Sequence, residues 1–148
     1  MKNIFKNKKA GFTLIEILVV IGIIAILATI VIIAINPARQ FKQGRDTQRT
    51  SNVNAILNGI GQYIADNKGV IPSEITTTAQ NISNGGANIC TDLVPKYLPS
   101  MVFDPSTTAV DCPTVATYDT GYTVIKDSND RIKVCATGEI TIPICVTR

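Results

Sequence analysis

The most informative residues of this chain are 8–20, which read Lys8-Lys9-Ala10-Gly11-Phe12-Thr13-Leu14-Ile15-Glu16-Ile17-Leu18-Val19-Val20. A short basic stretch ends in glycine, and an apolar run that contains one carboxylate begins at once. Acidic side chains are costly at the depth of a lipid bilayer, so the few that occur there usually have a function. Glu16 is therefore the first candidate functional residue.

The apolar run continues to Ile35 and is interrupted by only four residues, Thr13, Glu16, Gly22 and Thr29. As a helix, residues 12–35 would be roughly 36 Å long, which is enough to cross a hydrocarbon core of about 30 Å. A secretory signal peptide has a shorter apolar segment, and its small-residue cleavage site follows that segment. Here the small pair Ala10-Gly11 precedes the run. Cleavage at this pair would leave the apolar helix at the N-terminus of the mature protein.

The segment Gly11-Phe12-Thr13-Leu14-Ile15-Glu16 resembles the class III signal of type IV pilins and of the related pseudopilins of secretion and competence systems. In that family a membrane prepilin peptidase cuts after the glycine, and the new N-terminal residue is N-methylated. The resemblance implies cleavage between Gly11 and Phe12, methylation of Phe12, and a role for Glu16 in filament assembly.

The same resemblance implies partners and a location. The partners are the prepilin peptidase, a pilus assembly platform in the membrane, copies of the chain itself, and minor pilins. The chain would cross the cytoplasmic (inner) membrane once with its head outside, and would later form part of a periplasmic or extracellular filament.

The charge balance agrees with such processing. The chain has 14 basic and 11 acidic residues, and the leader 1–11 contains four of the basic ones, Lys2, Lys6, Lys8 and Lys9. Its removal leaves 10 basic against 11 acidic residues, a net charge of −1. The basic leader favours retention on the cytoplasmic side of the membrane. The basic pI is therefore no sign of a nucleic-acid-binding protein.

A second basic stretch follows the apolar run and comprises Arg39, Lys42, Arg45 and Arg49. Three interpretations are open: contact with anionic lipid headgroups, salt bridges between subunits, or contact with DNA during uptake. No aromatic residues alternate with these cations to offer a stacking platform for single-stranded DNA.

Residues 36–68 are expected to continue the helix as an amphipathic segment. Pro37 lacks an amide donor and clashes with the preceding turn, so a kink or break is expected near residues 34–37. Beyond it, apolar residues recur at helical spacing and end before Asn67-Lys68-Gly69; they are Val53, Ile56, Leu57, Ile60 and Ile64. The second half of this helix is expected to pack under a globular head, with the first half left free.

Residues 69–148 are expected to form that head. Residues 76–88 are rich in Thr, Asn and Gly and predict a loop. Three strands are expected at 122–126, 131–136 and 140–147, since apolar and polar residues alternate along the last two. In the third, Ile140, Ile142, Ile144 and Val146 would face the core, and Pro143 would make the strand an edge. The predicted fold class is α+β, pilin-like, with a long N-terminal helix packed in its second half on a small antiparallel sheet.

The four cysteines, Cys90, Cys112, Cys135 and Cys145, all follow the predicted span. An even number outside the cytoplasm favours disulfides, and the chain has no histidine to suggest zinc. The alternation places Cys135 and Cys145 on the polar side of adjacent strands, so they can face each other. Cys90 would then pair with Cys112.

Little in the sequence indicates catalysis. Without histidine, the common general base and the Ser-His arrangement are absent. The loop Asp127-Ser128-Asn129-Asp130 offers oxygen ligands for calcium, with Asp127, Asn129 and Asp130 as candidates, as in some secretion pseudopilins. The alternative is a polar hairpin turn. No other cofactor is expected.

Two classes of function remain. The first is a structural subunit of a type IV pilus-like filament, with a major pseudopilin of type II secretion or a competence pilin for DNA uptake as variants. The second is a monomeric, membrane-anchored binding domain. Glu16 favours the filament, because a buried carboxylate can compensate the N-terminal amine of Phe12 in a neighbouring subunit.

Overall fold

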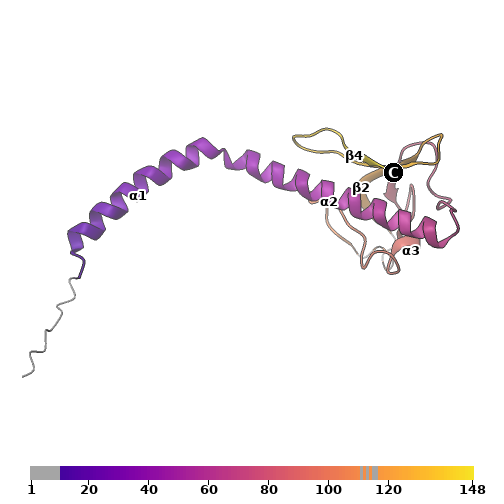
Figure 1. Cartoon of the computed structure of the whole chain (residues 1–148), viewed down its shortest axis with the longest axis horizontal. Helices are drawn as coiled ribbons and strands as arrows, with labels where there is room; N and C mark the ends of the chain where they lie inside the picture. Colours follow the sequence, from indigo (N-terminus) through magenta and orange to yellow (C-terminus); the bar gives the residue numbers. More distant parts are fainter. Residues whose placement is uncertain (1–10, 111, 113, 115–116) are drawn as a thin grey trace, which may run out of the picture. The chain divides into compact units, whose positions relative to one another are not determined.

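A computed structural model describes residues 11–110, 112, 114 and 117–148 of the chain (Figure 1). The predicted leader, apart from Gly11, lies outside the described residues. The chain divides into a first unit that ends at Gln40 and a second that runs from Phe41 to Arg148. The α+β fold predicted from the sequence is confirmed, since a long apolar helix precedes a small antiparallel sheet.

The first unit contains helix α1 (Leu14–Ile35), which is apolar on every side. Thr29 is one of its few polar residues, and its hydroxyl donates to the carbonyl of Ala25 at 2.9 Å, so this group is satisfied within the helix. An all-round apolar surface offers no face that prefers water. It is typical of a helix that is surrounded by lipid or by other helices.

The predicted break between residues 34 and 37 is confirmed. Helix α1 ends at Ile35, Asn36 adopts the left-handed conformation with φ 49°, and helix α2 (Pro37–Asp66) begins at the proline. Asparagine tolerates this conformation better than most residues, and proline suits the first position of a helix because the amide there is unpaired anyway. The Asn36 side chain also accepts from the amide of Arg39 at 3.3 Å.

Helix α2 supplies one wall of the core of the head. The predicted apolar stripe is buried at Val53, Ile56, Leu57 and Ile60 and half-buried at Ile64. A glycine within this stripe, Gly59, has a packing role: a Cβ atom there would lie 3.2 Å from Cγ of Leu98. The helix ends at Asp66, as the sequence predicts.

The other wall is an antiparallel sheet with the order β1-β2-β3-β4, which Figure 1 shows behind α2. Its strands are β1 (Gln80–Ser83), β2 (Asp119–Lys126), β3 (Ile132–Ala136) and β4 (Ile144–Thr147). The expected hairpin between β2 and β3 and the edge position of β4 are confirmed. The prediction of a loop throughout 76–88 was wrong, because β1 pairs with β2 at the opposite edge.

The third strand is shorter than expected. Strand β4 begins at Ile144, and residues 139–143 form a loop, so Ile140 and Ile142 do not face the core. Their side chains are 43% and 69% exposed. Contacts between this loop and α2 explain why the alternation does not continue as a strand.

Two disulfides join the same cysteines that the sequence favoured. Cys135 and Cys145 are partners in the β3–β4 register, and their Cα atoms lie 4.2 Å apart. Cys90, the first residue of the short helix α3 (Cys90–Leu93), joins Cys112 with the Cα atoms 6.3 Å apart. Both residues of this second pair are buried in the core, so the bridge fixes the irregular segment that precedes β2.

Candidate functional site

The start of helix α1 is a capping box made by Thr13 and Glu16. The Thr13 hydroxyl accepts from the amide of Glu16 at 3.3 Å. In return, Oε2 of Glu16 accepts from the amide of Thr13 at 2.7 Å and from its hydroxyl at 2.8 Å. This exchange satisfies two amides that a helix start leaves unpaired, and it places negative charge at the positive end of the helix dipole.

The capping box leaves part of Glu16 free. Both hydrogen bonds from Thr13 reach Oε2, and within the described residues no hydrogen bond reaches Oε1. Gly11 and Phe12 precede the helix and belong to no helix or strand, and Phe12 is 86% exposed. The backbone on both sides of the Gly11–Phe12 bond is therefore outside the helix.

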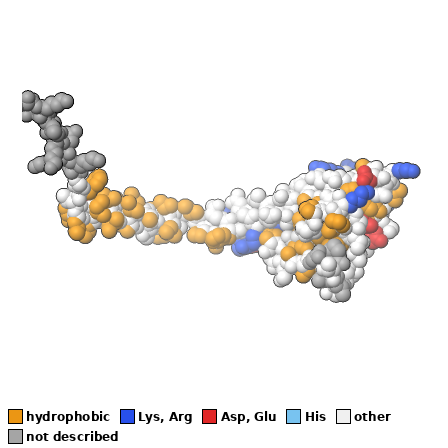
Figure 2. All heavy atoms as spheres, turned by 90° about the horizontal axis from the view of Figure 1, so that it is seen from below, with side chains coloured by type: hydrophobic (Ala, Val, Ile, Leu, Met, Phe, Trp, Pro, Cys, Tyr) orange, Lys and Arg blue, Asp and Glu red, His pale blue; other side chains and the backbone are white. Residues whose placement is uncertain are grey.

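The whole of α1 is accessible. None of its residues is buried, and Figure 2 shows hydrophobic side chains along the face of the helix in view. Within the described residues it is the one helix that is long and apolar enough to cross a membrane. An exposed apolar surface of this extent is not stable in water, because apolar area in water costs free energy in proportion to its size. It requires lipid or other chains around it.

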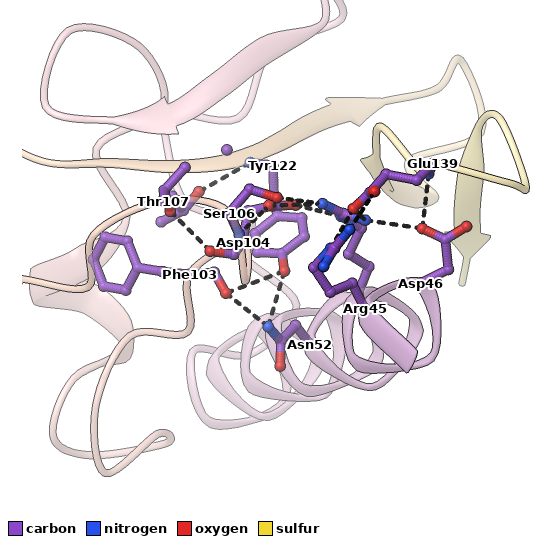
Figure 3. A network of polar contacts seen from close by, with 12 residues as sticks. Arg45, Asp46, Asn52, Phe103, Asp104, Ser106, Thr107, Tyr122 and Glu139 are labelled. Carbon is purple, nitrogen blue, oxygen red and sulfur yellow. Dashed lines mark hydrogen bonds and ion pairs between the residues drawn. The ribbon is translucent and has the colours of Figure 1, made fainter. Parts of the chain in front are cut away.

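Two residues of the second basic stretch, Arg45 and Arg49, form ion pairs within the head. Arg45 forms a two-pronged ion pair with Glu139, with Nε–Oε1 at 2.5 Å and Nη2–Oε2 at 2.6 Å. Arg49 is only 3% exposed and contacts Asp46, Asp104 and Glu139. These three carboxylates are labelled in Figure 3. The prediction that these two arginines are left free for lipid, DNA or other subunits was wrong. Both hold the head onto α2.

Asp46 binds the loop that precedes β4. Its carboxylate accepts three consecutive backbone amides, from Glu139 at 2.8 Å, Ile140 at 2.8 Å and Thr141 at 3.1 Å. The Arg49 guanidinium donates to the same carboxylate at 2.9 Å. These contacts, led by the Glu139 amide, hold the pKa of Asp46 below its usual range although burial opposes the shift. Consecutive amides that converge on an anion form a nest for negative charge.

The network continues into the core through Asp104 and Asn52. Burial disfavours the charge on Asp104, but hydrogen bonds from Arg49 and Ser106 outweigh this effect and lower its pKa. The Asn52 amide donates to the carbonyl of Phe103 and to the hydroxyl of Tyr122, both at 2.8 Å. Each buried charge therefore has a partner, which is the condition for keeping charges in a core.

The other two cations of the second basic stretch, Arg39 and Lys42, are not part of this network. No ion pair to Arg39 or Lys42 occurs within the described residues, and Lys42 is exposed. The open interpretations of the basic stretch therefore apply to these two residues alone.

The calcium hypothesis for Asp127, Asn129 and Asp130 does not fit the structure. Asp127 is occupied by the turn itself, because its Oδ1 accepts from the amides of Asn129 and Arg131 and its Oδ2 from Arg131 Nε. Asp130 pairs with Lys126 at 3.4 Å. Among the described residues, no three acidic, cysteine or histidine side chains are grouped to hold a metal ion. The arrangement is that of the alternative, a polar hairpin turn.

Two features of these sites, the capping box and the partners of Arg49, were not predicted from the sequence. The capping box has a local signature, since threonine followed three residues later by glutamate marks a helix start. The partners of Arg49 have no such signature, because Asp104 and Glu139 lie 55 and 90 residues away in the chain.

Comparison with known families supports the assignment of the N-terminal segment. Residues 6–32 match the family model described as the prokaryotic N-terminal methylation motif. This motif is the class III signal, the hallmark of type IV pilins and pseudopilins, so the resemblance of residues 11–16 to that family is confirmed. No significant match was found among curated proteins or among solved structures.

Proposed function

We propose that this chain, which shares the class III signal of type IV pilins and pseudopilins, is a structural subunit of a type IV pilus-like filament. After cleavage between Gly11 and Phe12, the helix would leave the membrane and polymerise with the same helix of other copies. The observation that supports this most is the combination of the methylation motif with a helix that is exposed along its whole length.

In this function α1 has two successive environments. Lipid surrounds the helix in the membrane, and neighbouring helices surround it in the filament, so its apolar surface is covered at both stages. The class III signal and the apolar helix fit an inner-membrane anchor with the head outside. In the filament, Glu16 would pair with the N-terminal amine of Phe12 in an adjacent subunit. Each charge would then compensate the other where neither can be hydrated.

A monomeric, membrane-anchored binding domain is the competing function. Such an anchor would also need α1, but it would gain nothing from a carboxylate near the start of the span. The capping box weakens this argument, because it gives Glu16 a local role within a single chain. The free Oε1 and the methylation motif still favour the filament.

Processing gives the first test. Gly11→Val should leave a full-length, membrane-bound precursor and no filaments, because the small residue before the scissile bond is lost. Gly22→Val is the matched control: it makes the same substitution in the span, where a Cβ would meet no atom within 4 Å. Mass spectrometry should show the control processed to a methylated Phe12. Wild-type filaments that retain Met1 would contradict the proposal.

A further inference from the structure

The loop between β3 and β4 has an unusual distribution of polarity. Its polar groups point toward α2, where the amides of residues 139–141 bind Asp46 and the Glu139 carboxylate binds Arg45. Its large apolar side chains point outward, with Ile142 69% and Ile140 43% exposed. Loops ordinarily present polar groups to water, so an outward apolar pair indicates an interaction surface.

The loop is held firmly in this orientation. The Cys135–Cys145 disulfide closes its base. At Gly138 the chain folds so closely on itself that a Cβ atom would lie 2.0 Å from the carbonyl oxygen of Thr141. With these constraints and the Asp46 contacts, the two isoleucines cannot turn inward without breaking the network.

Two exposed residues of α2 extend this surface. Phe41, 69% exposed, lies four residues before Arg45 and hence on the same side of the helix, and Arg45 binds the loop through Glu139. Lys42 follows it and is also exposed. We call Phe41, Lys42, Ile140 and Ile142 the base patch. It combines aromatic, aliphatic and cationic side chains.

We propose that the base patch binds the lipid surface of the membrane that holds α1 before assembly. Five residues lie between Ile35, the end of the apolar helix, and Phe41, so at most about 20 Å of chain joins them whatever the angle between the helices. Aromatic and basic residues directly beyond a span favour the bilayer interface, and aliphatic side chains add to binding as they enter it. The inference rests on the membrane-anchored stage of the proposed function.

Position in the chain favours lipid over a second copy as the occupant. Phe41 and Lys42 follow the span closely in sequence, and the loop that carries Ile140 and Ile142 is bonded to the next turn of α2 through Arg45 and Asp46. A contact there would hold the head at the membrane surface, and it would be released when the subunit enters a filament.

The chain has no tryptophan, which permits a direct test with single-tryptophan variants of the full chain. Ile142→Trp reports on the base patch and Ile26→Trp on the span. Val70→Trp is the matched control, because Val70 is 61% exposed and lies beyond the other end of α2. Each is reconstituted in phosphatidylcholine–phosphatidylglycerol vesicles whose acyl chains are brominated near the headgroup, brominated near the chain end, or left unmodified.

We expect bromine near the chain end to reduce the emission of Ile26→Trp, bromine near the headgroup to reduce that of Ile142→Trp, and neither to change that of Val70→Trp. Adding Phe41→Ser to Ile142→Trp should weaken the quenching. Quenching of Ile26→Trp alone would overturn the inference and leave the proposed function intact, whereas an unquenched Ile26→Trp would contradict the membrane stage itself. A blue shift of Ile142→Trp that grows with protein density, without quenching by lipid, would assign the base patch to a second copy and also overturn the inference.

Discussion

Arg49 and Asp104 lie 55 residues apart in the chain and form a two-pronged ion pair inside the head, with Nε–Oδ2 at 2.6 Å and Nη2–Oδ1 at 3.0 Å. The same guanidinium also contacts Asp46 and Glu139, so one cation of α2 joins two separate loops to the helix. Arg49 therefore joins this part of α2 to the segments that contain Asp104 and Glu139.

Replacing Arg49 by methionine should destabilise the head strongly. The substitution keeps the aliphatic volume but leaves several carboxylates buried together without their cation, and breaking such a buried pair costs about 3–5 kcal/mol. Lys42→Met removes an exposed cation from the same helix and should change stability by less than about 0.5 kcal/mol. Denaturant unfolding of the full chain in detergent, followed by tyrosine fluorescence, compares the two. Equal stabilities would show that the network contributes nothing.

Acid should destabilise the head through the same network. The Arg45 guanidinium, assisted by Arg49, lowers the pKa of Glu139 from 4.5 to about 2, and Asp46 is shifted in the same direction. Because these pKa values are lower in the folded state, the stabilisation is complete above about pH 5 and decreases as the pH falls toward 2. The free energy of unfolding, measured across this pH range, should be constant above about pH 5 and should decrease below it. Asp46→Asn should make the decline shallower, and an unchanged slope would exclude Asp46 as a contributor.

Filament assembly should depend on the charge of Glu16 and not on its capping role. Glu16→Leu should enter the membrane as well as the wild type but yield few or no filaments, because the neighbouring amine would lack its counter-charge. Glu16→Gln should give an intermediate yield. Thr13→Val is the control, since it removes the hydroxyl of the capping box and keeps the carboxylate.

The measurement for Glu16 is the amount of subunit in sheared surface preparations relative to the amount in membranes. Abundant filaments from Glu16→Leu would assign Glu16 to capping alone and favour the anchored binding domain. Loss of filaments from Thr13→Val would show that the helix start, and not the charge, is what assembly requires.

The two disulfides should differ in their contributions. They close segments with sequence separations of 22 and 10 residues. In the chain-entropy model each contributes roughly 2–5 kcal/mol, and the longer segment gains about 0.7 kcal/mol more. The paired variants Cys90→Ser/Cys112→Ser and Cys135→Ser/Cys145→Ser can be compared by denaturant unfolding. Non-reducing peptide mapping checks the pairing, and a peptide that links Cys90 to Cys145 would refute it.

Features with a local signal were predictable from the sequence. The apolar stripe from Val53 to Ile60, the break before Pro37 and the β2–β3 hairpin each follow from spacing or from one residue type, and each is present. Strand β1 was missed because Gln80-Asn81-Ile82-Ser83 is mostly polar. It is a strand because it pairs with β2, and long-range pairing of this kind overrides weak propensity.

The loop before β4 was mispredicted for the opposite reason, because its sequence has the pattern of a strand but it is not one. Ile140 and Ile142 alternate with polar residues as a strand would, yet the amides of residues 139–141 bind Asp46 instead of a neighbouring strand. The competing partner lies more than 90 residues earlier in the chain, so no pattern around residue 140 could reveal it. The burial of Arg49 was unpredictable for the same reason.

The contacts of Asp46 with residues 139–141 have a consequence for the order in which the head folds. They join positions 93 to 95 residues apart, near the two ends of the head. Such distant contacts form only after most of the chain is available. A polypeptide that stops before Glu139 has its apolar helix and most of its core, but Asp46 lacks the three amides that bind it. The first turns of α2 within the head are therefore completed only when the end of the chain has been made.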